Sequence, residues 1–153
     1  MSKRVKFILG GLAAILVIIQ FVGPSRPEVR ADNPDDLLVT SEVGEEVATL
    51  LRTACYDCHS METNYPWYAS IAPVSWRVYG HINHGREELN FSEWAKLKRT
   101  RKVRKLRDLG ETVEAGDMPL SDYVLLHSEA NLSDEQRTIL VEWADAFARD
   151  VMK

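Results

Sequence analysis

The pentapeptide CYDCH at residues 55–59 constrains this chain more than any other feature, because it holds both of its cysteines. Cys55 and Cys58 lie three positions apart, and His59 follows directly. A single turn of helix brings residues at this spacing close together. The pentapeptide therefore indicates a metal site, a redox dithiol, a disulfide or the attachment point of a larger group.

Three of these four interpretations fit the rest of the sequence poorly. A zinc site needs four ligands, and the best completion, His81 with His84, lies far along the chain at an unusual spacing. A thioredoxin-like dithiol belongs to a βαβ context, and no strand pattern precedes Cys55. A disulfide between residues three apart closes a very short loop and constrains the chain little.

The fourth interpretation uses all three residues of the motif. In C-x-x-C-H, two thioethers attach a haem covalently and the adjacent histidine becomes an axial ligand of the iron. We therefore predict one haem c (iron) per chain, with Cys55 and Cys58 as the covalent attachment points and His59 as an axial ligand. The sequence contains no further cysteine that could compete for a disulfide.

A second axial ligand is expected if the haem carries electrons. Met118, in the stretch GDMPL, is the predicted ligand, because the glycine and proline around it favour a loop. It follows His59 at a distance that lets the chain return on the far face of the haem. His81 and His84 are the alternatives, and His127 is expected to pack or to act as a cation at a helix end.

Residues 1–26 form a separate N-terminal segment. A basic flank precedes an uncharged run whose apolar part, residues 7–23, would make a helix of about 26 Å. That length is near the lower limit for crossing a bilayer and long for a signal peptide. Because no A-x-A cleavage site follows, we predict an uncleaved anchor in the inner (cytoplasmic) membrane, with a cleaved signal as the alternative. The basic flank stays cytoplasmic, so the remaining chain faces the periplasm or cell exterior.

The rest of the chain is predicted to be a tether, residues 27–41, and one all-α domain, residues 42–153. Prolines and acidic residues favour an extended tether, whereas apolar residues beyond it recur at spacings of three and four. The predicted helices are 42–54, 74–88, about 93–109, ending at Gly110, and a last one from Ser133, where Gln136 gives a capping-box pattern.

Two groups of side chains near the motif are candidates for the walls of a haem pocket. The aromatic residues are expected to surround the porphyrin or to pack in the core: Tyr65, Trp67, Tyr68 and Trp76. Arg77 and Arg86 are the nearest cations that could pair with the haem propionates, and simple solvation is the alternative for each.

The run from Lys96 to Arg107 contains eight Lys and Arg among twelve residues. It is either a solvated helix face or a docking patch for an acidic redox partner or anionic lipid head groups. Nucleic acid is not an expected partner, because the net charge is −4 and the run lies on the outer side of a membrane.

The sequence resembles the prokaryotic haem-binding domain family, which consists of small exported c-type cytochrome domains. The resemblance rests on CYDCHSMETNYPWYASIAPVSW, HINHGREELNFSEW and MPLSDYVLLHSEANLSDEQRTILVEW, and it covers roughly residues 40–145. It implies a cytochrome-c-like helical fold with haem at Cys55 and Cys58, axial His59, and Met118 opposite. The family pattern favours His81 over His84 as the alternative ligand.

Together these inferences predict a membrane-tethered, extracytoplasmic monohaem c-type cytochrome that carries single electrons rather than an enzyme. The alternative from another class is a haem enzyme or small-gas sensor with an open or displaceable sixth ligand. The sequence offers no evident general acid and base beside His81 that would favour catalysis.

Overall fold

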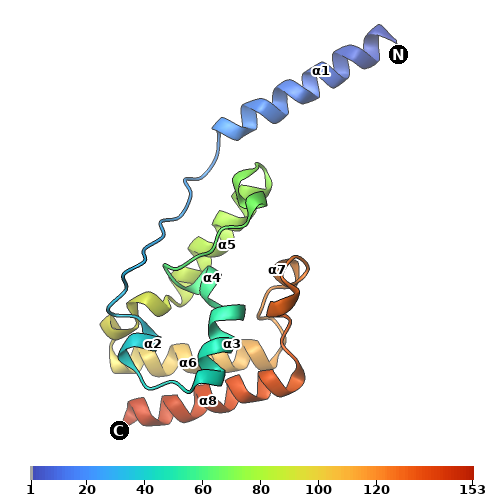
Figure 1. The fold of residues 1–153 in the computed structure, drawn as a ribbon. Coiled ribbons are helices and arrows are strands. Elements are labelled where there is room, and N and C mark those ends of the chain that lie inside the picture. Colours follow the sequence, from blue (N-terminus) through green and yellow to red (C-terminus); the bar gives the residue numbers. More distant parts are fainter. Residues whose placement is uncertain (1) are drawn as a thin grey trace.

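Helices α6 (Arg99–Glu114) and α8 (Asp134–Met152) lie side by side and form the base of the domain (Figure 1). The computed structural model describes residues 2–153, and every regular element in that range is helical. The prediction of an all-α fold behind an N-terminal apolar helix is therefore confirmed. The other elements are α1 (Lys3–Ile18), η1 (Ile19–Phe21), α2 (Leu37–Thr40), α3 (Glu45–Ala54), α4 (Tyr56–His59), η2 (Trp67–Ser70), α5 (Val74–Glu88), η3 (Phe91–Lys96), α7 (Ser121–Val124) and η4 (Ser128–Ala130).

Helix α8 begins as predicted at a capping box. The Ser133 hydroxyl accepts a hydrogen bond from the Gln136 backbone N–H at 3.2 Å, and the Gln136 side chain accepts from the Ser133 N–H at 2.9 Å. These two bonds satisfy donors that the first turn of a helix leaves free. Leu140, Ala144 and Ala148 then form the buried stripe that packs on α6 and α3.

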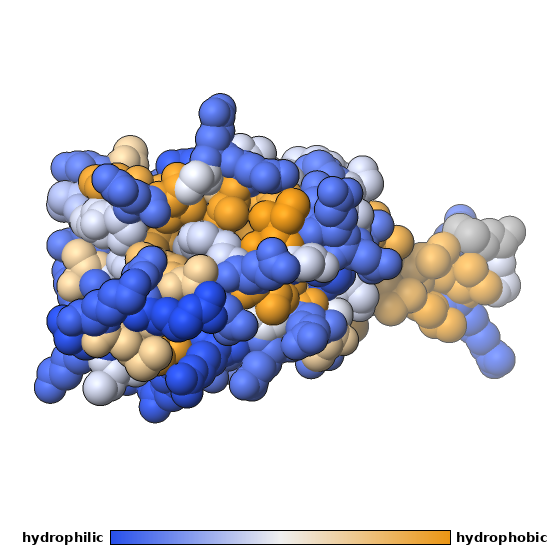
Figure 2. Space-filling view, turned by 90° about the horizontal axis from the view of Figure 1, so that it is seen from below, coloured by the Kyte–Doolittle hydropathy of each residue, from blue (hydrophilic) through white to orange (hydrophobic). Residues whose placement is uncertain are grey.

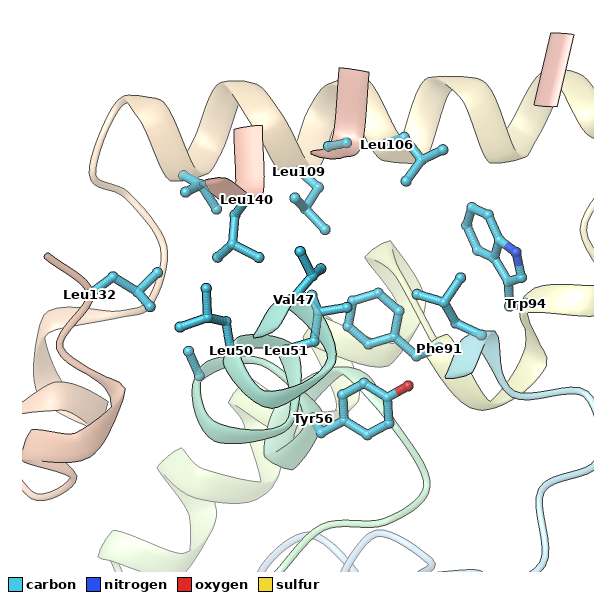
Figure 3. Packing of buried hydrophobic residues seen from close by; sticks show 14 of the residues in the cluster. Val47, Leu50, Leu51, Tyr56, Phe91, Trp94, Leu106, Leu109, Leu132 and Leu140 are labelled. Atoms are coloured by element: carbon cyan, nitrogen blue, oxygen red, sulfur yellow. The ribbon is translucent and has the colours of Figure 1, made fainter. Parts of the chain in front are cut away.

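The core lies between α3, α6, α8 and the 3₁₀ segment η3 (Figure 3). Trp94 and Phe91, both from η3, are almost completely buried, and Trp94 stacks on Phe147 of α8. Tyr56, inside the CYDCH motif, stacks on Phe91 with ring centroids 5.0 Å apart. The motif is thus attached directly to the core.

Helix α6 differs from its prediction at both ends. Residues 91–96 form η3, where the Asn90 side chain accepts from the Ser92 N–H at 3.1 Å, so the α-helix starts only at Arg99. At the other end, α6 runs through Gly110 to Glu114. A glycine inside a helix costs about 1 kcal/mol, and the packing of α6 on α8 outweighs this cost.

The predicted extended tether is partly helical. Asp36 caps α2 by accepting from the Leu38 N–H at 2.8 Å, and Leu37 is fully buried. The Asp36 carboxylate is itself buried and also accepts hydrogen bonds from Tyr56, at 2.8 Å, and Ser92, at 3.3 Å. The end of this segment therefore belongs to the core. Helix α3 likewise starts at Glu45, with Gly44 as its N-cap, rather than after Ser41.

The N-terminal helix projects from the end of the domain opposite to α6 and α8 (Figure 1). Residues 3–21 form one helical stretch with a mean hydropathy of 1.9, and none of it is buried. It is long and apolar enough to cross a membrane, and a signal sequence has the same properties.

Candidate functional site

The CYDCH motif forms one helical turn, α4, set at an angle to the preceding helix. Cys55 ends α3 by donating its N–H to the Leu51 carbonyl at 2.9 Å, and its own carbonyl accepts from the His59 N–H at 2.9 Å. Its φ of −126° redirects the chain between the two helices. Cys55, Cys58 and His59 thus lie on one helical turn, and both thiols are free.

Asp57 fixes this turn from both sides. One carboxylate oxygen accepts from the Asn64 N–H at 2.8 Å, and the other accepts from the Tyr123 hydroxyl at 2.8 Å. The Asp57 carbonyl accepts a third hydrogen bond from the Thr63 hydroxyl. Asp57, one of the two residues between the cysteines, thus joins the motif to the loop after it and to α7.

Helix α5 passes very close to the same turn. A Cβ atom on Gly85 would lie 2.8 Å from the Cys58 carbonyl oxygen, so only glycine fits there without a shift of backbone. The Arg86 guanidinium donates to the Ser60 carbonyl, the Thr63 hydroxyl and the Glu28 carbonyl. Arg86 therefore joins three segments by hydrogen bonds, which neither solvation nor pairing with a propionate predicted.

Three of the predicted site residues line one hollow of about 330 Å³. Cys55 and His59 reach it from α4, and Met118 reaches it from the loop after α6. The volume is within the range of small-molecule sites. Most of the remaining wall is apolar: Ala54, Leu89, Phe91, Leu109, Val113, Pro119 and Leu132.

The His59 ring is oriented by a backbone acceptor. Its Nδ1 lies 3.0 Å from the Leu89 carbonyl oxygen, which can only accept. Nδ1 therefore carries the proton, and Nε2 keeps a free lone pair. Burial lowers the pKa of His59, which favours the neutral form that binds metals.

A second hollow of about 240 Å³ lies on the other side of α4. Cys58 and His81 line it, together with Tyr68 and His127. The structure thus separates His81 from His59 and Met118, and it places His84 on the wall of the first hollow instead. The sequence ranks His81 above His84 as the alternative second ligand, but His84 is the histidine that shares a hollow with His59.

His127 packs among aromatic rings, as expected from its sequence context. Its Nε2 lies 2.7 Å from the Tyr68 hydroxyl oxygen, and its ring stacks on Tyr123 at 4.2 Å. Arg77 forms an ion pair with Asp122 at 2.7 Å. These contacts hold α7 against α4 and α5.

The four aromatic residues expected at the haem or in the core lie in different places. Tyr68 alone of the four lines one of the two hollows beside the motif. Trp67 is 79% exposed, Tyr65 packs edge-on against Tyr79, and Trp76 lies against Gly23. An aromatic-rich sequence does not state which way each ring points.

The environment of the thiols argues against a redox dithiol or a zinc site. Burial raises the pKa of Cys55 to about 12 and that of Cys58 to about 11. Reactive cysteines instead have a lowered pKa. Among residues 2–153, no three His, Cys, Asp or Glu side chains come together as a metal-ligand cluster.

Comparison with known proteins assigns a cofactor class to this arrangement. A family model described as a haem-binding domain matches residues 14–146, which is most of the chain. No significant match was found to a curated protein or to a solved structure.

The contact between α5 and α4 gives the first testable prediction. Gly85→Ala should destabilise the protein by about 1–3 kcal/mol, because the added methyl group must push the Cys58 backbone away. Gly80→Ala in the same helix is the matched control, since nothing lies within 4 Å of its Cβ position. It should be neutral or stabilising by up to about 1 kcal/mol. Thermal unfolding followed by circular dichroism measures both, and equal stability of the two variants would contradict the close approach.

Proposed function

The chain belongs to the haem-binding domain family, and from this premise we propose that it is a membrane-tethered monohaem cytochrome c that carries single electrons. The observation that carries this proposal is that Cys55, His59 and Met118 share one hollow although Met118 is far away in the sequence. A bound haem with two protein ligands supplies a one-electron change at iron and leaves no open position for a substrate.

Cys55, His59 and Met118 lie on one hollow, as the attachment of one haem c requires, whereas Cys58 lines the hollow on the other side of α4. Cys55 and Cys58 would form the two thioethers, and His59 offers its Nε2 lone pair because Leu89 occupies Nδ1. The raised pKa values keep both cysteines as thiols rather than thiolates at neutral pH, which disfavours disulfide exchange. The apolar wall of the hollow would exclude water and help to set the reduction potential.

Met118 is the second ligand that the arrangement supports best. Its backbone is fixed, because its N–H donates to the Thr112 carbonyl at 3.2 Å and its carbonyl accepts from Arg137 at 2.7 Å. The Met118 side chain is half-buried, on the wall of the same hollow as His59. A methionine ligand raises the reduction potential of a c-type haem. His81 faces the other hollow and is the weaker alternative.

The ligand assignment predicts the spectrum of a variant. Met118→Ala should abolish the weak red absorption band that arises from methionine bound to ferric haem, because alanine offers no thioether. Met152→Ala is the matched control, since Met152 is exposed at the end of α8 and should keep the band. The measurement is the visible spectrum of the oxidised protein.

Two outcomes would contradict this account. A red band that survives in Met118→Ala would move the ligand role to another residue, and His84→Ala and His81→Ala would then identify it. Ready binding of carbon monoxide by the reduced wild-type protein at neutral pH would favour the gas-sensor or enzyme alternative, which needs a displaceable ligand.

The proposed location follows from the N-terminal helix. Its basic flank would stay in the cytoplasm, so the haem domain would face the periplasm or cell exterior from the inner membrane. Covalent haem attachment usually takes place on that side. The helical stretch at residues 3–21 has no buried residue, which suits contact with lipid.

The basic run Lys96–Arg107 is proposed to dock an acidic redox partner protein. Helices α6 and α8 form the end of the domain away from α1 (Figure 1), so the run lies far from the proposed membrane segment. The face seen from below in Figure 2 shows hydrophilic residues around a smaller apolar area. Lys105 lines the hollow that holds His59, but it pairs there with Glu88 at 3.2 Å. Arg101 and Arg104 lie together on another part of the α6 surface, beside Lys98, and would supply the positive charge of the docking surface.

Small redox ions test the role of this charge. In a double variant, Arg101→Glu with Arg104→Glu, electron transfer to ferricyanide should slow several-fold at low ionic strength, because an anionic oxidant is attracted less. Electron transfer from hexaammineruthenium(II), a cation, should instead accelerate. The control is Arg149→Glu on α8, which is exposed as well. Stopped-flow rates that do not differ between the double variant and the control would contradict the steering role.

A further inference from the structure

The end of the apolar N-terminal helix is fixed to the haem domain by one glutamine side chain. Gln20 lies in η1, the last turn of this helix. Its Oε1 accepts from the Ala72 N–H at 2.9 Å, and its Nε2 donates to the Ala72 carbonyl at 3.2 Å. Nε2 also donates to the Leu16 carbonyl at 2.8 Å. Both backbone groups of Ala72 are thus bound to the helix that would cross the membrane.

The residues after Gln20 continue this attachment. Gly23 has a φ of +141° and lies so close to the Trp76 indole that any Cβ atom would overlap it. The Arg26 guanidinium sits 3.9 Å above the Tyr65 ring, whose hydroxyl donates to the Pro27 carbonyl at 2.8 Å. The chain leaving the anchor therefore follows the domain surface instead of separating from it.

Large apolar side chains are exposed around the same point of the domain. Trp67 is 79% exposed, Ile71 47% and Val74 45%. We call these three residues the proximal patch. They belong to η2 and the start of α5, which form the part of the domain that reaches toward α1 in Figure 1. Ile71 is the direct neighbour of Ala72, so the patch lies at the level of Gln20.

We propose that the proximal patch inserts into the interfacial region of the bilayer leaflet from which the anchor emerges. This inference rests on the membrane anchor of the proposed function. A helix that spans the bilayer over residues 3–21 places Gln20 at its surface, and two hydrogen bonds then hold Ala72 at the same depth. Tryptophan prefers the membrane interface, and the burial of Ile71 and Val74 in lipid is favourable.

The partner is therefore lipid, and the contact sets the orientation of the domain. Two separate attachments, the spanning helix and the proximal patch, restrict tilting about the Gln20 position. Helix α6 and the proposed docking run at Lys96–Arg107 would then point away from the bilayer (Figure 1). A second protein on the patch is the competing occupant, and the experiment below separates the two.

Photolabelling from lipid tests the proposal on the full-length, haem-loaded chain. The protein is reconstituted into nanodiscs of phosphatidylcholine and phosphatidylglycerol that contain a lipid with a diazirine near its head group. After photolysis, labelled peptides are identified by mass spectrometry. We expect label on residues 7–23 and on residues 67–76, and none around Val39, a 68% exposed valine in α2 at the other end of the domain.

Two variants make the assignment specific. Trp67→Ser with Ile71→Ser and Val74→Ser should reduce label on 67–76 several-fold and leave label on 7–23 unchanged, whereas Val39→Ser should change neither. Gln20→Ala leaves the proximal patch intact but removes the two hydrogen bonds to Ala72, so label on 67–76 should also fall. This single variant keeps the test valid if the triple variant fails to fold.

The outcomes separate this inference from those on which it rests. Label on 7–23 without label on 67–76 overturns the lipid contact while the anchor stands, and a nanodisc mass of two chains would then indicate a second copy on the patch. Absence of label on 7–23 overturns the anchor and the inference with it. The haem spectrum of the same sample reports on the cofactor independently.

Discussion

The burial of Tyr56 fixes the helical turn on which the whole site depends. Its ring stacks on Phe91 at 5.0 Å, and its hydroxyl donates to the buried Asp36 carboxylate at 2.8 Å. Because these two contacts hold Tyr56 in place, α4 keeps one orientation. Cys55 and His59 then face the hollow on one side of α4, and Cys58 faces the hollow on the other side. A buried hydroxyl and carboxylate are costly unless they are paired, which makes this orientation strongly specified.

Polar contacts from distant segments complete the same turn. Asp57 binds the loop after the motif and Tyr123 of α7, while Arg86 joins α5 to the backbone after the motif and to the segment that follows α1. Hydrogen bonds therefore connect both of these distant segments to the motif.

Features determined by neighbouring residues could be predicted from the sequence. The Ser133 capping box and the single turn of CYDCH depend on short spacings, and both occur as expected. The end of α6 could not be predicted, because the tolerance of Gly110 depends on packing against α8. The burial of Asp36 likewise depends on a partner twenty residues away.

Prediction of the site is limited in the same way, because it depends on contacts between residues far apart in the sequence. Met118 was predicted from its loop context, and its presence in the hollow with His59 results from the path of the chain through α5, η3 and α6. His81 and His84 are three residues apart on α5, yet they line different hollows, and no pattern in the sequence distinguishes them. The directions of Tyr65, Trp67 and Trp76 were missed because composition carries no information on where a ring points.

The central claim is that haem is bonded to the chain through both sulfurs. The most direct measurement is acid–acetone extraction of the denatured protein, produced with haem-maturation machinery and assayed as the pyridine haemochrome. The account predicts that one haem per chain stays with the polypeptide, and that Cys55→Ser with Cys58→Ser releases it into the acetone. Pigment that leaves the wild-type chain on extraction would contradict the account.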